Sequence, residues 1–228
     1  MIAYNIVSNV YSSTFDIKVK LPGADDLMII RNISIPTPGK HNVLNALAAI
    51  SIGIELGFSA RVIKDGFKNF AGVSRRFTKI GDYNDAEIID DYAHHPVEIH
   101  ATIDTAKSIT DKRGAKVIAV FQPHRYTRLR DLFDDFAKCF AGADKVYILD
   151  VFSAGESPIT NFTSKDLANK IKEQKIVNVE YLEDKSTLPD AIQKQSKKGD
   201  LILFMGAGNI TYLAKEVLNI LNNQLEIV

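Results

Sequence analysis

One short stretch of the chain, from Ile88 to Pro96, concentrates side chains that can take part in chemistry. It is IIDDYAHHP, so an apolar run ends in two carboxylates, a tyrosine, two imidazoles and a proline. Carboxylates and imidazoles bind ligands and transfer protons, and a turn that only joins a strand to a helix rarely carries so many of them. Asp90, Asp91 and His95 could serve only as turn and capping residues, with Pro96 at the first helical position. We expect instead that the turn forms part of a ligand site.

A second stretch, QPHRYTR, places three basic or titratable side chains, His124, Arg125 and Arg128, within seven residues. Guanidinium groups suit carboxylate or phosphate ligands. A helix that begins at Arg128 would hold Arg128 and Arg130 at its positive end, which is unfavourable unless an anion compensates. The alternative is a solvated basic loop. The sequence favours an anion site here.

Two further stretches carry weaker signals. GAGN, with Gly206 and Gly208, lets the backbone approach a phosphate closely, but it lacks the third glycine of a dinucleotide fingerprint and could be only a tight turn. HNVLN offers His41, Asn42 and Asn45. The two amides lie three residues apart on one face of a predicted helix, where they could bind a base edge, although Asn42 could simply cap the helix.

The elements that must position these side chains alternate between strand and helix from about Phe77 onward. Strands are predicted at 87–90, 116–121, 145–150, 178–182 and 200–205, and helices at 96–109, 128–140, 164–174, 187–197 and 209–222. This alternation predicts an α/β domain with a doubly wound, mostly parallel sheet. DDYAHHP, QPHRYTR, SAGE and GAGN each follow a strand, so we expect all four at the edge where ligands bind in such sheets.

The first part of the chain has a different pattern. Strand-like segments IAYNIVSNV, FDIKVKL and LMIIRNISI, with a turn at 22–26, predict a hairpin at the edge of a larger sheet. Helices are predicted from Asn42 to Leu56 and from Ser59, the N-cap, to Phe70. Residues 1–76 offer little material for a core, so we predict that they form an incomplete domain with exposed apolar surface and unpaired strand edges, and that residues 77–228 fold alone.

Composition argues against several classes of protein, although a local basic cluster stays compatible with it. Lys plus Arg and Asp plus Glu each number 28 among 228 residues, so no excess charge favours a nucleic acid or an anionic membrane as partner. The single cysteine, Cys139, excludes an internal disulfide and is expected to be a small buried hydrophobe in a reducing compartment. No signal peptide, membrane-length apolar run or metal motif of the HExxH or CxxC kind is present, and a cytoplasmic location is expected.

Six stretches in order carry a resemblance to one family. PGKHNVLNALAA, GVSRRF, IIDDYAHHP, VFQPHRYTR, LDVFSAGE and DLILFMGAGN resemble the Mur ligases of peptidoglycan synthesis, over about residues 15–222. The resemblance implies a C-terminal Rossmann-like domain, residues 77–228, preceded in residues 1–76 by the last strands and helices of a central ATPase domain. The family's N-terminal UDP-binding domain and its phosphate loop have no counterpart here, since Gly39-Lys40 lacks the Walker glycine five residues earlier, where Ser34 stands.

Within the family, the stretches are most similar to members that join L-alanine to UDP-N-acetylmuramate. ATP phosphorylates the muramate carboxylate, and the alanine amine attacks the acyl phosphate. The implied cofactors are ATP and Mg²⁺, with the metal ligands in the unmatched part, and the chain is expected to be inactive without that part as its partner. Three alternatives stay open: a family member that recycles murein tripeptide, which is expected to differ at QPHR, a non-catalytic module that binds an anion or a nucleotide, and a remnant with no function, whose melting temperature no ligand would shift.

The resemblance also implies roles for individual residues. It assigns His41, Asn42 and Asn45 to adenine, Arg76 and Asp91 to the nucleotide and its phosphates, and Tyr92, His94, His124, Arg125 and Arg128 to alanine and the acyl phosphate. Of these, Arg76, Asp91, His124, Arg125 and Arg128 are expected to contribute to catalysis. Glu156 and Gly206–Gly208 are further candidates.

Overall fold

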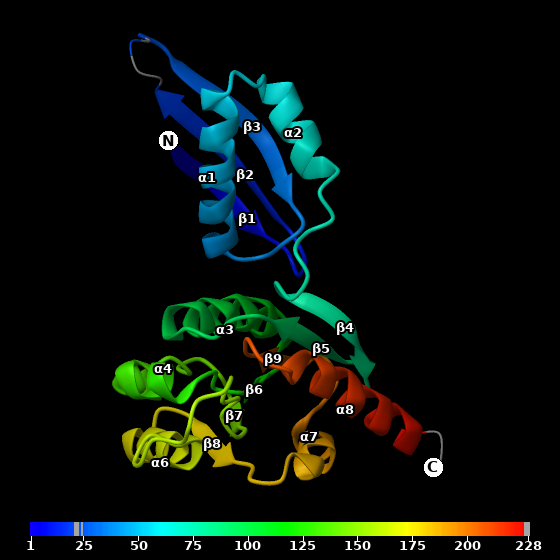
Figure 1. The fold of residues 1–228 in the computed structure, drawn as a ribbon. Helices are drawn as coiled ribbons and strands as arrows, with labels where there is room; N and C mark the ends of the chain where they lie inside the picture. The colour runs from blue at the N-terminus through cyan, green and yellow to red at the C-terminus, as the bar shows by residue number, and fades with distance from the viewer. Residues whose placement is uncertain (21–22, 24, 226–228) are drawn as a thin grey trace. The chain divides into compact units, whose positions relative to one another are not determined.

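The protein is described by a computed structural model of residues 1–20, 23 and 25–225, and it divides into two compact units, Met1–Ser74 and Arg75–Val228 (Figure 1). Within the described residues, no helix is long and apolar enough to cross a membrane. The assignment of the first unit to a central ATPase domain stays a prediction.

The first unit is a three-stranded antiparallel sheet packed against two helices. Its elements are β1 (Ile2–Ser8), β2 (Ser13–Lys20), β3 (Leu27–Ile35), α1 (Lys40–Glu55) and α2 (Ala60–Lys68), in the sheet order β1-β2-β3. Alternate residues of β2 and β3, among them Phe15, Ile17 and Ile33, form the core with Val43 and Ile50 of α1, as strand periodicity requires. The predicted hairpin is therefore part of a three-stranded meander. Leu21 and part of the turn predicted at 22–26 lie outside the described residues.

The predicted exposure of apolar side chains in this unit is confirmed. Ile2 and Leu27, on the outer strands, are exposed, and so are Leu44 and Ile52 on α1. Both outer strands also have an edge that pairs with no other strand in the described part of the chain.

Ser59 caps α2, as the sequence predicts, and its hydroxyl accepts a hydrogen bond from the Val62 amide at 3.4 Å. We expect Ser59→Ala to lower the free energy of unfolding of this unit by about 1 kcal/mol, because a helix-terminal amide loses its partner. Ser51→Ala, on the exposed part of α1, is the control and should change it by less than about 0.5 kcal/mol. Urea denaturation followed through NMR signals of β2 measures both, and equal effects would contradict the capping role.

The second unit is a three-layer α/β/α domain around a six-stranded sheet. The strands are β4 (Thr78–Tyr83), β5 (Ala86–Asp91), β6 (Val117–Phe121), β7 (Lys145–Ile148), β8 (Asn178–Tyr181) and β9 (Leu201–Met205). Their order is β4-β5-β9-β6-β7-β8, and all neighbours are parallel except β4 and β5. This confirms the predicted mostly parallel, doubly wound sheet.

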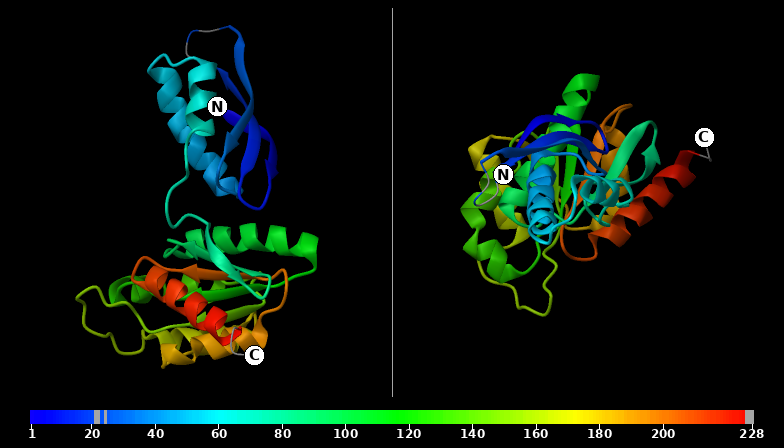
Figure 2. Two further views of the ribbon diagram at one scale, coloured as in Figure 1. Left: turned by 90° about the vertical axis from the view of Figure 1, so that its right-hand side faces the viewer. Right: turned by 90° about the horizontal axis from the view of Figure 1, so that it is seen from above.

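Helices cover both faces of this sheet (Figures 1 and 2). They are α3 (Pro96–Thr110), α4 (Tyr126–Asp131), α5 (Phe133–Lys138), α6 (Ser164–Gln174), α7 (Leu188–Gln195) and α8 (Ile210–Leu225), with 3-10 turns at Asp111–Arg113 and Lys185–Thr187. One face packs on α7 and α8. The other lies under α3, α5 and α6, where Phe121 of β6 contacts Phe136 and Phe140. Cys139 is buried nearby, as predicted.

Two features differ from the sequence prediction. The antiparallel edge strand β4 was not predicted. The single helix predicted at 128–140 is two short helices, because Leu132 leaves the helical conformation with φ −119° and ψ 23°. Arg128 and Arg130 consequently lie in the last turn of the six-residue α4, where positive charge is favourable. The argument that their charges require a compensating anion is therefore wrong.

Candidate functional site

The polar stretches after β5, β9, β6 and β7 meet at one edge of the sheet. Because these four strands are parallel, their carboxyl ends lie together, with Asp91 paired to Met205 and Met205 to Phe121 across the ladder. This is where open α/β sheets bind ligands. The sequence prediction that one edge gathers DDYAHHP, GAGN, QPHRYTR and SAGE is confirmed.

Asp91 ends β5 and is almost completely buried. One carboxylate oxygen accepts the Ala93 amide and the other accepts the Phe77 amide, both at 2.8 Å. Burial raises the pKa of this carboxyl to about 6, although the two amide hydrogen bonds and Arg76 act in the opposite direction. Asp91 therefore holds the start of the turn against the segment that enters β4.

Arg75, which the sequence analysis missed, links three parts of this edge. Its guanidinium donates to the Gly206 carbonyl at 2.5 Å, lies 4.7 Å from the centre of the Tyr92 ring, and has its Nε 3.7 Å from a carboxylate oxygen of Asp90. Burial raises the pKa of Asp90, and the Arg75 charge and the Thr211 hydroxyl offset part of that rise. The one feature of the sequence that could have indicated a role for Arg75 is its position directly before Arg76.

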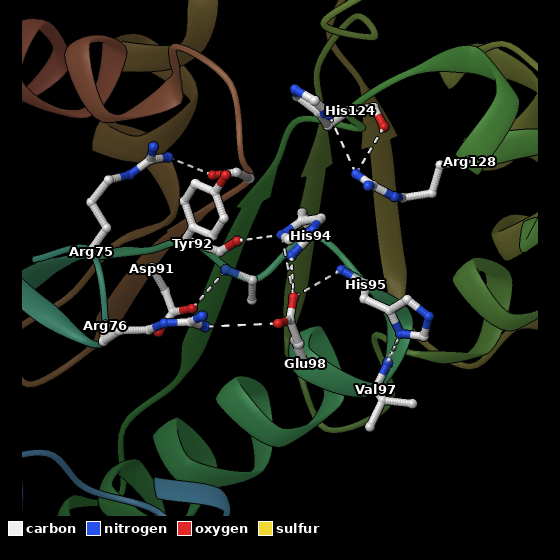
Figure 3. A network of polar contacts seen from close by, with 12 residues as sticks. Arg75, Arg76, Asp91, Tyr92, His94, His95, Val97, Glu98, His124 and Arg128 are labelled. Carbon is white, nitrogen blue, oxygen red and sulfur yellow. Dashed lines mark hydrogen bonds and ion pairs between the residues drawn. The ribbon is translucent and has the colours of Figure 1, made fainter. Parts of the chain in front are cut away.

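A network of polar contacts surrounds His94 (Figure 3). Its Nδ1 lies 2.9 Å from the Tyr92 carbonyl and 3.3 Å from a carboxylate oxygen of Glu98. The same oxygen accepts the amides of His94 and His95, and the other Glu98 oxygen lies 3.9 Å from Arg76. His95 and Pro96 start α3 as predicted, at its N-cap and first helical position. Glu98 also escaped the sequence analysis, although it stands three residues after the N-cap, the spacing of a capping box.

The QPHRYTR stretch faces this network. The rings of His94 and His124 are 6.5 Å apart, and His124 stacks on Phe152 with ring centres 5.4 Å apart. Arg128 contacts Nδ1 of His124 at 3.3 Å. Burial, followed by the charges of Arg128 and His94, lowers the pKa of His124. A neutral His124 can accept a hydrogen bond from Arg128 and so orient its guanidinium.

Arg125 is held by its backbone and by Glu156. It adopts a positive φ of 72°, a conformation that costs a non-glycine residue about 1–3 kcal/mol and is common at functional sites. Its amide donates to the Phe152 carbonyl at 2.9 Å. The Glu156 carboxylate accepts both the amide and the hydroxyl of Thr127 and lies 3.8 Å from the Arg125 guanidinium. Glu156 therefore positions the loop that carries Arg125.

The GAGN turn packs too closely for side chains. A Cβ on Gly208 would lie 2.7 Å from the Phe152 ring and 2.9 Å from the Gln122 side-chain oxygen, and one on Gly206 would lie 2.9 Å from the Gln122 carbonyl. The glycines therefore allow this turn to sit directly against the loop that follows β6.

We expect Gly208→Ala to displace Phe152 and the stacked His124, and to lower the free energy of unfolding of the second unit by about 1–3 kcal/mol. Gly66→Ala, in α2, is the control, since open space surrounds that glycine and alanine favours a helix. NMR spectra show the displacement of His124, and the same spectra recorded through a urea titration give the free energy of unfolding. An unchanged His124 signal in Gly208→Ala would contradict the packing argument.

The candidate adenine residues lie in the first unit, at the start of α1. Gly39 is the N-cap of this helix, so the alternative in which Asn42 is the cap is wrong. The Asn42 side chain instead donates to the Pro38 carbonyl at 2.7 Å, and Asn45 is exposed one turn later. The second unit carries all the other residues that the sequence assigned to the site.

Among residues 1–20, 23 and 25–225, no three or more Asp, Glu, His or Cys side chains gather in a way that could hold a metal ion. Both carboxylate oxygens of Asp91, a buried acid at the site, accept hydrogen bonds from backbone amides. The described residues at this edge of the sheet therefore do not fit a Mg²⁺ site.

Comparison with known proteins identifies the family. The family model for the Mur ligase, glutamate ligase domain matches residues 75–208, which is more than half of the chain and most of the second unit. The chain belongs to the Mur ligase family. This agrees with the resemblance that the six sequence stretches carry.

Relatives of this Mur ligase chain are longer than it is. The UDP-N-acetylmuramate–L-alanine ligases of Rickettsia felis and Rickettsia rickettsii are 53% and 52% identical over 218 residues, 95% of this chain but only 46% and 45% of theirs. The Thermotoga maritima UDP-N-acetylmuramate–alanine ligase superposes with a TM-score of 0.74 at 26% identity, over 97% of this chain and 46% of that one. The chain thus spans about half the length of these relatives.

A Psychrobacter arcticus murein peptide ligase superposes with a TM-score of 0.63 over 97% of this chain and 44% of its own. At 24% identity it shows the shared fold alone.

Proposed function

We propose that this chain supplies the amino-acid side, and part of the ATP side, of a ligase that joins L-alanine to UDP-N-acetylmuramate. The observation that carries the proposal is the meeting of Tyr92, His94, His124 and the loop of Arg125 and Arg128 at one sheet edge. The names of the Rickettsia and Thermotoga relatives support the choice of substrates.

In this proposal Arg125 and Arg128 bind the alanine carboxylate, because guanidinium groups bind carboxylates through paired hydrogen bonds. Glu156 and His124 fix the orientation of the two arginines. Arg76 neutralises charge on the ATP phosphates and the acyl phosphate, and Asp91 holds the turn beside it. Positioning and charge stabilisation are the main contributions expected from protein groups in acyl-phosphate chemistry of this kind. ATP contacts in the first unit are assigned to His41, Asn42 and Asn45, and Mg²⁺ to the part of the ligase that this chain does not match.

We further propose that the chain alone does not ligate, and that the part of the Rickettsia felis ligase which it does not match restores activity when added as a separate polypeptide. The experiment mixes the two purified parts with ATP, Mg²⁺, UDP-N-acetylmuramate and L-alanine, and measures the UDP-N-acetylmuramoyl-alanine product by mass spectrometry. Product from the chain alone would contradict the first statement, and no product from the mixture would contradict the second.

The second candidate is a non-catalytic module that binds an anion, which the basic loop at His124, Arg125 and Arg128 favours. Two measurements separate these candidates: calorimetry with phosphate, and product formation in the mixture. An anion-binding module binds phosphate through these arginines and gives no product in the mixture, whereas the ligase part gives product. A tripeptide-recycling ligase would be recognised in the same mixture by preferring the murein tripeptide to L-alanine.

A further inference from the structure

The hydrogen bonds of His94 determine which of its ring nitrogens carries the proton. Nδ1 lies 2.9 Å from the Tyr92 carbonyl and 3.3 Å from a Glu98 carboxylate oxygen. A carbonyl and a carboxylate both accept hydrogen bonds and donate none, so Nδ1 must be the donor. When His94 is neutral, its Nε2 therefore carries a lone pair.

His124 has the opposite arrangement. Its Nδ1 lies 3.3 Å from an Nη of Arg128, which can only donate, so Nδ1 must accept and Nε2 must carry the hydrogen. The two rings are 6.5 Å apart. The site thus contains one imidazole that can accept a proton at Nε2 and one that can donate a hydrogen bond from Nε2.

Glu98 is the residue that both orients His94 and connects it to Arg76. One oxygen accepts the His94 and His95 amides and contacts His94 Nδ1, and the other faces Arg76 at 3.9 Å (Figure 3). The Tyr92 carbonyl is the hydrogen-bond acceptor of Nδ1, and the Glu98 carboxylate lies at ion-pair distance from the same nitrogen. A carboxylate in that position favours a hydrogen on Nδ1 and stabilises the imidazolium that forms on protonation. The rings of Tyr92 and His124 also lie beside His94, with ring centres 5.1 Å and 6.5 Å away, and neither side chain is a carboxylate.

We propose that Glu98 is a positioning residue that, together with the Tyr92 carbonyl, holds His94 as the Nδ1–H tautomer, so that His94 Nε2 is the proton acceptor of the site. The role of Nε2 as a proton acceptor rests on the proposed function, whereas the tautomer does not. The α-ammonium group of the incoming amino acid gives one proton to Nε2, which makes His94 an imidazolium paired with Glu98. The electron pair left on the amine nitrogen then attacks the acyl carbon of the acyl phosphate. The tetrahedral intermediate loses a second proton from nitrogen to solvent, and the bond from the acyl carbon to the phosphate oxygen breaks, so that phosphate leaves and the amide remains.

The positioning claim is tested on the chain itself by long-range proton–nitrogen NMR of ¹⁵N-histidine protein, since the chain has five histidines. Single replacements of the histidines assign the signals. We expect His94 to show a protonated Nδ1 and a lone-pair Nε2, and His124 to show the reverse. A protonated Nε2 on neutral His94 would overturn the proposal.

Glu98→Met keeps the length and the helix propensity of the side chain but removes the carboxylate. The Tyr92 carbonyl still accepts from Nδ1, so the variant should raise the fraction of the Nε2–H tautomer of His94 above that of the unaltered chain. Glu98→Gln keeps an acceptor oxygen and should restore the single tautomer. Asp166→Ala is the matched control, because Asp166 completes the capping box of α6 with Thr163 and should leave His94 unchanged. A single Nδ1–H tautomer in Glu98→Met would show that Glu98 only caps α3, and would overturn its positioning role.

These spectra require no ligation, so they decide the tautomer whether or not the proposed function holds. The ligation mixture tests the proton transfer with two nucleophiles. Hydroxylamine is largely unprotonated at neutral pH and needs no base, so His94→Gln should lower L-alanine ligation by about 10²-fold and spare hydroxamate formation. Equal losses with both nucleophiles would overturn the role of Nε2, and failure of both products with the unaltered chain would overturn the proposed function instead.

Discussion

Arg76→Ala should lower the kcat of the reconstituted ligation by about 10²–10³-fold, the usual effect of removing one group that stabilises transition-state charge. Arg76 is half-buried beside the site, 5.8 Å from the Tyr92 ring and 3.9 Å from Glu98. Its ion pair with Glu98 is long, and its charge also acts on the pKa of the buried Asp91. Steady-state kinetics of product formation measures the effect.

Arg113→Ala is the matched control for this experiment. Arg113 forms a 2.6 Å ion pair with Glu87 at the start of β5, the opposite edge of the sheet from the site. Its removal should leave kcat within a factor of about two, because exposed and partly exposed ion pairs contribute little. Near-normal turnover of Arg76→Ala, or an equal loss in both variants, would remove Arg76 from the mechanism.

Asp91 should make the second unit less stable as the pH rises from about 4 to about 7. The folded state raises the pKa of this carboxyl from 3.8 to about 6, so the unfolded chain loses the proton first. The contribution of the protonated group is complete below pH 3.8, and it is lost as the pH rises through about 6. One pKa unit corresponds to about 1.4 kcal/mol, which gives a total loss of about 3 kcal/mol.

The measurement is urea denaturation at pH 4 and at pH 7, followed by NMR signals of β6 and β9 because the chain contains no tryptophan. Asp91→Asn cannot ionise, so between these pH values the unaltered chain should lose about 2–3 kcal/mol more of its free energy of unfolding than the variant does. Burial also raises the pKa of Asp90. Because Asp90 is present in both proteins, its contribution to the pH dependence of stability largely cancels in the comparison. Parallel pH dependences in the two proteins would contradict a buried, proton-binding Asp91.

Local sequence patterns predicted most of the second unit, because its strands and helices have strong periodicity and clear caps. Helix α6 begins and ends where the sequence predicts. Strand β4 was missed because its residues alternate weakly and it is an edge strand, stabilised by pairing with β5 rather than by its own composition. The break at Leu132 was missed because a continuous apolar face is compatible with both one helix and two.

The site residues could be predicted only where their chemistry was evident from residue type and spacing. His94, His124 and Arg128 follow strands, and parallel topology then brings them together. Arg75 and Glu98 act through contacts with segments distant in the chain or with backbone amides, which spacing does not reveal. The roles of the site residues remain predictions, since contacts among protein groups do not identify a ligand.

The most direct measurement of the central claim is product formation by the mixed halves, with Arg128→Ala compared with Arg130→Ala. Arg128 contacts His124 within the site, whereas Arg130, two residues later, is paired with the neighbouring Asp131 at 2.7 Å. We predict UDP-N-acetylmuramoyl-alanine from the mixture, none from either half alone, a large rise in the KM for L-alanine with Arg128→Ala, and near-normal kinetics with Arg130→Ala. Turnover by this chain alone, no product from the mixture, or identical kinetics in the two arginine variants would contradict the account.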